Sequence, residues 1–341
     1  MKKAASSKRK SEEDIKREKE IINNIKKKYK ELSGHYNSKI MFSDYTDISI
    51  ESKTLRIHIA NKEINIKKTE IKYPVSVNMQ TDGAAFEGWA ICLKAWLSEE
   101  VEKVHLTWDI PSTVNDHYNR FLYRVLRFGE MFDWFSFDDK DNCVSQFKTR
   151  FINTKNNSSN KVPNRKNKEC EEQVEFDLVN KNQNAFISHF GIKKLYQHLP
   201  IGVKTDKNSN LFSGRNSAID LWGIIDNRTL NIFELKYIKA HSKSKNIKVG
   251  IISELLLYIN IMNDIRLGII NTPNAKLSHE KELYRIIRLI ENIKGIFLTN
   301  DKHPLLASPY VKSLLNCNNK NLLFDFVNYS WDNSVKKIIF N

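Results

Sequence analysis

The sequence lacks several features that would mark other classes of protein. Its 341 residues include only four cysteines, which are far apart and form no Cys-x-x-Cys pair, so a zinc ribbon is not expected. No apolar run reaches the roughly 18 residues of a transmembrane helix. The basic N-terminus has no apolar segment of the kind found in secretory signals. We therefore expect a cytoplasmic protein with reduced thiols.

Signatures of several enzyme classes are also missing. The chain contains neither Gly-x-Gly-x-x-Gly nor the Gly-x-x-x-x-Gly-Lys-Ser/Thr loop, which argues against nucleotide binding by those routes. It has no Gly-x-Ser-x-Gly elbow. His279-Glu280 has no second histidine at the spacing of a zinc pair, and isolated histidines such as His189 and His303 are interpreted as structural.

Basic residues outnumber acidic ones, giving a net charge of +15 and a pI of about 9.4. A strongly basic protein favours a polyanionic partner, because its lysines and arginines neutralise phosphates and release counterions. The bias toward Lys, Asn and Ile would also arise from an AT-rich genome. The charge therefore supports a nucleic-acid partner without identifying one.

Acidic residues occur inside two consecutive apolar segments. Asp220 stands in the first, and Glu234 and Lys236 lie two residues apart in the second, residues 230–237. The polar residues 226–229 between them predict a turn, so we expect an antiparallel hairpin. Such a hairpin would bring Asp220 close to Glu234.

Strand geometry predicts where these side chains point. Residues i and i+2 of a strand share a face, so Glu234 and Lys236 are expected to project together with Ile232. Phe233 and Leu235 would then take the opposite, packed face. Glu-x-Lys on a solvated strand, or one Asp near a turn, is common by itself. Charged groups in two adjacent apolar strands are costly unless they have partners, so the combination indicates a function.

Neighbouring carboxylates repel each other unless a cation lies between them. Mg²⁺ prefers oxygen ligands and keeps several waters, which leaves room for a phosphate and a nucleophile. A bound metal lowers the pKa of its water and neutralises charge on the phosphate. Lys236 would add a compact cation that orients the water or stabilises the transition state.

The Ile-Asp dipeptide, the hairpin and the following Phe-Glu-Leu-Lys resemble the core of the PD-(D/E)xK nuclease superfamily, which includes restriction endonucleases, Holliday-junction resolvases, and repair and defence nucleases. The resemblance implies an α/β (α+β) fold, a restriction-endonuclease-like mixed sheet flanked by helices. It implies that Asp220 and Glu234 bind Mg²⁺ or Mn²⁺, with the Leu235 carbonyl as a further ligand. Lys236 would assist the hydrolytic water.

The resemblance extends to the segment before the hairpin. Residues 171–184 are expected to form an acidic helix like the first core helix of the superfamily, which often presents a glutamate to the site. Glu175 is the candidate and Glu172 the alternative. Either could instead be an exposed helix position.

The segments after the hairpin also fit. Residues 251–262 predict the next core helix, and residues 295–299 predict the following strand. Several such nucleases carry Gln-x-x-x-Tyr in this helix, where the present chain has Glu254-x-x-x-Tyr258. The spacing of four keeps both residues on one face. Glu254 is thus either an extra acidic ligand or an ordinary helix residue.

Four segments are expected along the chain: a basic tail and helix (1–33), a separate α+β domain (34–152), a polar linker (153–168) and the nuclease-like domain (169–341). In the α+β domain we predict strands at 47–51, 55–59, 63–66 and 104–108 and helices at 86–97 and 118–135. Arg120, Arg124 and Arg127 are expected to form a basic stripe on the last of these helices. The aromatic residues there are interpreted as core, and the domain as one that positions substrate or partner.

Two basic loops are expected to contact nucleic acid. The first, 204–215, leads into the Asp220 strand and ends at Arg215. The second, 239–248, contains Lys239 and Lys243.

Together these features predict a Mg²⁺-dependent nuclease, best read as a DNA endonuclease of a restriction, anti-phage defence or repair system. DNA is favoured over RNA as the partner, and a homodimer or larger defence complex is compatible with cutting both strands. The alternative is a non-catalytic nucleic-acid-binding or assembly subunit that retains a nuclease scaffold.

Overall fold

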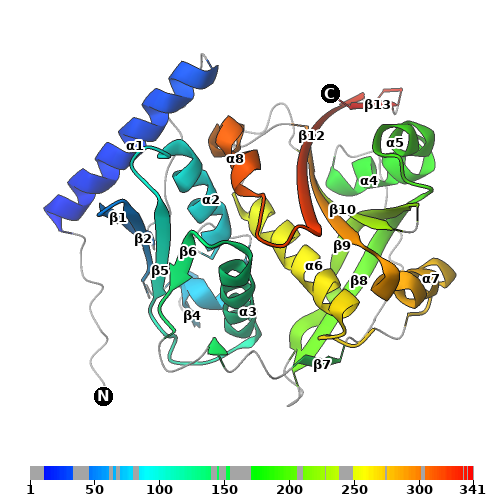
Figure 1. Ribbon diagram of the computed structural model, residues 1–341, viewed down its shortest axis with the longest axis horizontal. Helices are drawn as coiled ribbons and strands as arrows, with labels where there is room; N and C mark the ends of the chain where they lie inside the picture. Colours follow the sequence, from blue (N-terminus) through cyan, green and yellow to red (C-terminus); the bar gives the residue numbers. More distant parts are fainter. Residues whose placement is uncertain are drawn as a thin grey trace. The chain divides into compact units, whose positions relative to one another are not determined.

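The computed structural model describes residues 11–33, 46–60, 64–66, 70–79, 84–139, 144–145, 151–153, 170–205, 210–226, 228–237, 249–272, 275–300, 304–332, 334–335 and 337–340. The chain divides into two compact units (Figure 1). The first comprises residues 1–145, 248–250 and 304–314, and the second comprises residues 146–247, 251–303 and 315–341. Each contains a mixed sheet flanked by helices, so the fold is α+β.

The first unit is built on a four-stranded sheet in the order β1-β2-β5-β6. Its strands are β1 (Thr46–Glu51), β2 (Thr54–Ile59), β5 (Lys103–Trp108) and β6 (Phe135–Phe137). β1 and β2 are antiparallel, whereas the other two pairs are parallel. Two short strands, β3 (Ile64–Ile66) and β4 (Glu70–Lys72), pair separately. The strands predicted from alternating apolar residues are confirmed.

The helices of the first unit are α1 (Glu12–Ser33), α2 (Phe86–Trp96), α3 (Asp116–Met131) and α8 (Pro309–Leu314). Residues such as Trp89, Trp96 and Phe121 are buried, so the interpretation of these aromatics as core is confirmed. The predicted extension of α3 to Phe135 is wrong. The helix ends at Met131, because the backbone at Phe135 pairs with Val104 in the sheet.

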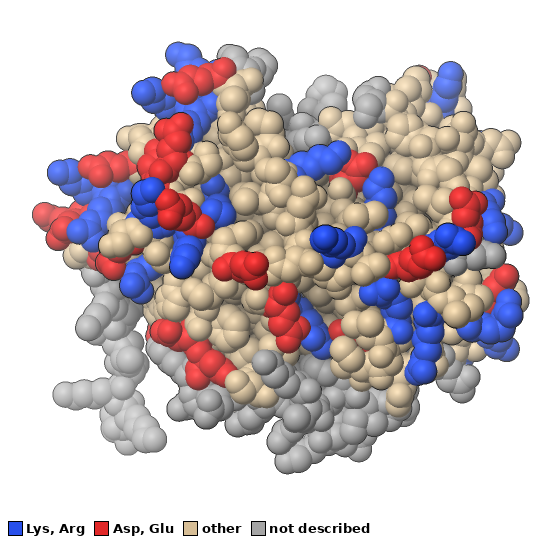
Figure 2. All heavy atoms as spheres, viewed as in Figure 1, with Lys and Arg blue, Asp and Glu red and all other residues tan. Residues whose placement is uncertain are grey.

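The predicted basic stripe on α3 is also wrong, because its central member is buried. Arg124 is 4% exposed and forms an ion pair with the equally buried Glu87 of α2. Two hydrogen bonds join the guanidinium to the Glu87 carboxylate, and a third runs from Arg124 Nη2 to the Ala84 carbonyl oxygen at 2.7 Å. Over α1, at the left of Figure 2, Lys and Arg side chains alternate with Asp and Glu side chains. Neither helix therefore presents a uniformly basic surface.

The second unit contains a seven-stranded sheet in the order β13-β12-β11-β10-β9-β8-β7. Its strands are β7 (Phe151–Asn153), β8 (Leu195–Thr205), β9 (Asn210–Ile225), β10 (Thr229–Lys236), β11 (Asn292–Thr299), β12 (Leu322–Asp332) and β13 (Lys337–Phe340). β9 and β10 form the predicted antiparallel hairpin, and β10, β11 and β12 run parallel. Backbone 210–215, predicted as loop, belongs instead to β9, which pairs with β8.

Helices cover both faces of this sheet. They are α4 (Glu171–Asn180), α5 (Gln183–Phe190), α6 (Gly250–Leu267) and α7 (Ser278–Ile286). Val174 of α4 and Phe186 of α5 share one apolar cluster with Phe233 and Leu235 of β10. The single helix predicted over residues 171–184 is therefore two helices. Between the two helices, the backbone N–H groups of residues 181 and 182 both donate to the Asp177 carbonyl at the end of α4.

The opposite face of the sheet carries α6. A Cβ atom on Gly295 of β11 would collide with Ile259 of α6, so the helix lies directly against that strand. Ile232 and Glu234 on this face are 0% and 1% exposed. The expectation of a single packed face on β10 is therefore wrong, because both faces are covered. None of the described helices combines the length and apolarity that a membrane crossing requires.

Candidate functional site

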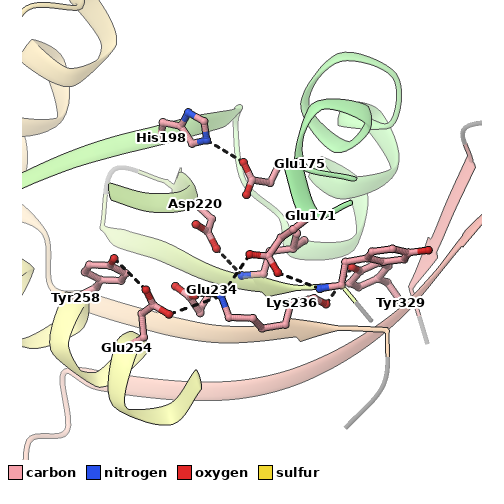
Figure 3. Close-up of polar contacts among 11 residues, drawn as sticks. Glu171, Glu175, His198, Asp220, Glu234, Lys236, Glu254, Tyr258 and Tyr329 are labelled. Carbon is pink, nitrogen blue, oxygen red and sulfur yellow. Dashed lines mark hydrogen bonds and ion pairs between the residues drawn. The ribbon is translucent and has the colours of Figure 1, made fainter. Parts of the chain in front are cut away.

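Acidic side chains from four elements of the second unit converge where β10 ends, around one lysine (Figure 3). They are Glu171 and Glu175 of α4, Asp220 of β9, Glu234 of β10 and Glu254 of α6, and the lysine is Lys236 of β10. The β9–β10 hairpin is responsible for bringing the strand residues together. Its register pairs Leu221 with Phe233, so Asp220 lies beside Glu234.

Three of these residues form what we call the carboxylate cluster: Glu171, Glu175 and Asp220. One carboxylate oxygen from each lies within 4.8 Å of the others. Glu171 and Glu175 can act together because residues four apart lie on the same face of a helix. Carboxylate oxygens are the ligands that hard divalent cations prefer.

Backbone groups hold the carboxylate cluster against the end of β10. The Leu235 N–H donates to Asp220 Oδ2 at 2.9 Å, and the Tyr237 N–H donates to Glu171 Oε2 at 3.2 Å. The Lys236 carbonyl accepts a hydrogen bond from the Tyr329 hydroxyl at 3.1 Å. The carboxylates of Asp220 and Glu171 are thus held in place by the backbone at the end of β10.

Lys236 lies among three carboxylates. Its Nζ donates to Glu234 Oε1 at 2.5 Å and lies 3.5 Å from Glu171 Oε1 and 3.6 Å from Glu254 Oε2. Burial by itself lowers the pKa of Lys236, but the surrounding acids outweigh it and raise that pKa well above its usual value. The lysine is therefore held in its charged form.

The acidic side chains at this site outnumber the basic side chains described in contact with them. Burial, and then the neighbouring Glu175, raise the pKa of Asp220 well above its ordinary value. The pKa of Glu234 is raised by burial and by Asp220 and Glu254. Burial also raises the pKa of Glu171, although Lys236 partly opposes this. The protein thus places carboxylates together in a setting that favours protonation or a cation.

These residues fit a divalent cation. The donor set consists of oxygens, and the basic side chains in contact with these acids include Lys236 and His198. Glu234 Oε2 is buried and has no hydrogen-bond partner among the described residues. Glu171, Glu175 and Asp220 would hold the ion, whose positive charge would offset the repulsion among these carboxylates.

Glu254 is held between a hydroxyl and the lysine. The Tyr258 hydroxyl donates to Glu254 Oε1 at 3.3 Å, while Glu254 Oε2 faces Lys236. Burial, followed by the charge of Glu254, raises the pKa of Tyr258 well above its usual value. Tyr258 therefore stays a neutral donor, and Glu254 contacts the lysine.

The structure brings together four of the predicted residues, Asp220, Glu234, Lys236 and Glu175. Leu235 contributes its N–H to Asp220, whereas it was predicted to contribute its carbonyl to a metal. Glu234 was predicted as a metal ligand; its Oε1 accepts from Lys236, and the carboxylate cluster consists of other residues.

Glu172, the alternative to Glu175, is exposed, and sequence reasoning missed Glu171. The four-residue interval between Glu171 and Glu175 was the available signal. Of the predicted nucleic-acid contacts, Arg215 is described only as backbone of β9, and Lys239 and Lys243 lie outside the described residues.

Two more residues at the site were missed. Gln197 Nε2 donates to Glu175 Oε2 at 3.0 Å, and His198 Nε2 lies 2.8 Å from the same oxygen. Both belong to β8, far from the hairpin in sequence, and no periodic pattern singles them out. Comparison of the chain with protein-family models, with curated proteins and with solved structures finds no match.

Proposed function

We propose that this protein is a metal-dependent nuclease that hydrolyses phosphodiester bonds, with DNA as its preferred substrate and Mg²⁺ as its cofactor. The observation that carries the proposal is the carboxylate cluster, with the charged Lys236 held beside it. The second unit, a mixed sheet with helices on both faces, would be a restriction-endonuclease-like domain. The net charge of +15 supports a polyanionic substrate.

Each group would have a distinct role. Glu171, Glu175 and Asp220 would hold the cation, which when bound supplies an activated water and neutralises charge on the phosphate. Lys236 would stabilise the negative charge that develops on the phosphate or orient the attacking water. Glu234 and Glu254 hold the Lys236 ammonium from the side of α6.

The test is cleavage of supercoiled plasmid, linear duplex, single-stranded DNA and structured RNA in Mg²⁺, Mn²⁺ or EDTA. Wild type should cut in either metal and not in EDTA, and Asp220→Ala and Lys236→Ala should both lose cleavage. Glu172→Gln is the matched control, because it removes an exposed carboxylate from the same helix turn and should cut normally. Wild-type cleavage by Asp220→Ala would falsify the site. Binding of DNA without cleavage in either metal would favour the assembly-subunit alternative.

A further inference from the structure

We propose that Gln197 and His198 are positioning residues that hold Glu175 in the orientation required to bind the cation. This inference rests on the proposed metal site, and it assigns a role to two residues of β8 that the hairpin motif does not include. The observation that carries it is that consecutive residues of one strand both reach the same carboxylate oxygen, Glu175 Oε2.

That convergence is unusual for a strand. Consecutive side chains normally point to opposite faces, so Gln197 and His198 would be expected on different sides of the sheet. His198 departs from extended backbone, with a φ of 53°, a left-handed conformation that residues other than glycine rarely adopt. The departure turns both side chains toward α4, as the approach of His198 to Glu175 shows in Figure 3.

The register of β8 and β9 places the left-handed residue, His198, opposite the carboxylate cluster. Gln197 pairs with Leu221 and Leu199 pairs with Ile219, so His198 lies across from Asp220 on the neighbouring strand. The strained residue therefore lies beside the cluster, and its side chain, 43% exposed, remains open to solvent.

The contacts from Gln197 and His198 restrict the orientation of the Glu175 carboxylate. An ionised carboxylate only accepts hydrogen bonds, so His198 must donate from Nε2. Among the described residues, the hydrogen bonds to Glu175 end on Oε2. Glu175 is only 6% exposed at its side chain and has three side-chain torsions to order.

Without the donors of Gln197 and His198, repulsion from Asp220 and Glu171 would favour orientations of Glu175 directed away from the cluster. Groups that orient a ligating side chain in this way commonly change metal affinity or activity by about 10–100-fold.

The test is titration of the DNA-free full-length protein with Mn²⁺, with the bound ion measured by electron paramagnetic resonance. His198→Gly keeps the left-handed backbone accessible but removes the donor, and Gln197→Met removes the other donor at similar length. Each should raise the Mn²⁺ dissociation constant by about tenfold. His198→Gln, which retains a donor of comparable reach, should stay within about threefold of wild type.

Two controls separate the possible failures. Circular dichroism and melting in EDTA check that each variant is folded, and cleavage by His198→Gly should recover at saturating Mn²⁺ if only affinity was lost. Wild-type Mn²⁺ affinity in both His198→Gly and Gln197→Met would overturn the positioning role while leaving the nuclease proposal intact. Wild-type protein that binds Mn²⁺ but cleaves nothing would overturn the nuclease proposal alone. Wild-type protein that binds no Mn²⁺ would overturn both.

Discussion

Each unit of this protein buries charged side chains, but the two do so with different balances. In the first unit, Glu87 and Arg124 are both almost fully buried, and the carboxylate of one is matched by the guanidinium of the other. In the second, Glu171, Glu175 and Asp220 are gathered near a lysine that is already in contact with Glu234. A buried carboxylate is thus not in itself a sign of function. The sign is a group of carboxylates that outnumbers the basic side chains described in contact with it.

The largest expected difference between the two units comes from Asp220→Asn, which should lower nuclease activity without lowering the free energy of unfolding. Removing the charge from one member of a repelling group relieves electrostatic strain, while a ligand and its transition-state stabilisation are lost. We expect cleavage to fall on the order of 10³-fold, with a free energy of unfolding in EDTA equal to or above that of wild type. Cleavage kinetics and urea denaturation measure the two effects. A large loss of stability would show that Asp220 is primarily structural.

Arg124→Met in the first unit should have the opposite outcome. It removes the buried guanidinium that pairs with the buried Glu87 carboxylate, and breaking a buried ion pair in this way costs about 3–5 kcal/mol. Urea denaturation should show the loss, and adding Glu87→Leu to the same chain should recover much of it, because the buried carboxylate is then removed as well. Wild-type stability of Arg124→Met alone would mean that the Glu87–Arg124 pair contributes little to the free energy of unfolding. The proposed difference between the buried charges of the two units would then be wrong.

The smallest effect concerns pH. The pKa values of Asp220 and Glu234 are raised in the folded protein, so their ionised forms oppose folding. In EDTA, the stability associated with their protonated forms should be present below the unfolded pKa of about 4 and lost as the pH rises through the raised folded values. Mg²⁺ should reduce that loss, because a cation stabilises the ionised carboxylates.

The measurement is urea denaturation at stepped pH, with Mg²⁺ or EDTA, in wild type and Glu234→Gln. The difference between the two proteins isolates the site from exposed acids elsewhere. Identical pH profiles in EDTA would argue that Glu234 carries no destabilising charge in the folded state.

The sequence was sufficient where the information is local. Alternation in residues 55–59 and 104–108 predicted β2 and β5, and the polar turn between the segments holding Asp220 and Glu234 predicted the hairpin. Residues 251–262 were correctly predicted as helical, although α6 extends to Leu267. These elements follow from periodicity and turn chemistry, which do not depend on distant parts of the chain.

The sequence was insufficient where a side chain depends on a distant partner. Arg124 was grouped with Arg120 and Arg127 by helical spacing, but its burial depends on Glu87, 37 residues earlier. Glu171 is selected over Glu172 by the docking of α4 near Tyr237, which helix spacing cannot specify. The left-handed backbone of His198 has no local signature such as glycine, so the contact with Glu175 could not be foreseen.

Gly295 gives the site a mechanical dependence on a residue that carries no charge. A Cβ at this position would collide with the end of the Ile259 side chain, so the absence of a side chain on Gly295 lets α6 pack close against β11, and Glu254 is carried on that helix. A larger residue there would require the Ile259 side chain or α6 itself to shift, and a shift of α6 would change the distance from Glu254 to Lys236 without altering any ionisable group. An uncharged position on β11 is thus connected, through the packing of α6, to the charged groups around the lysine.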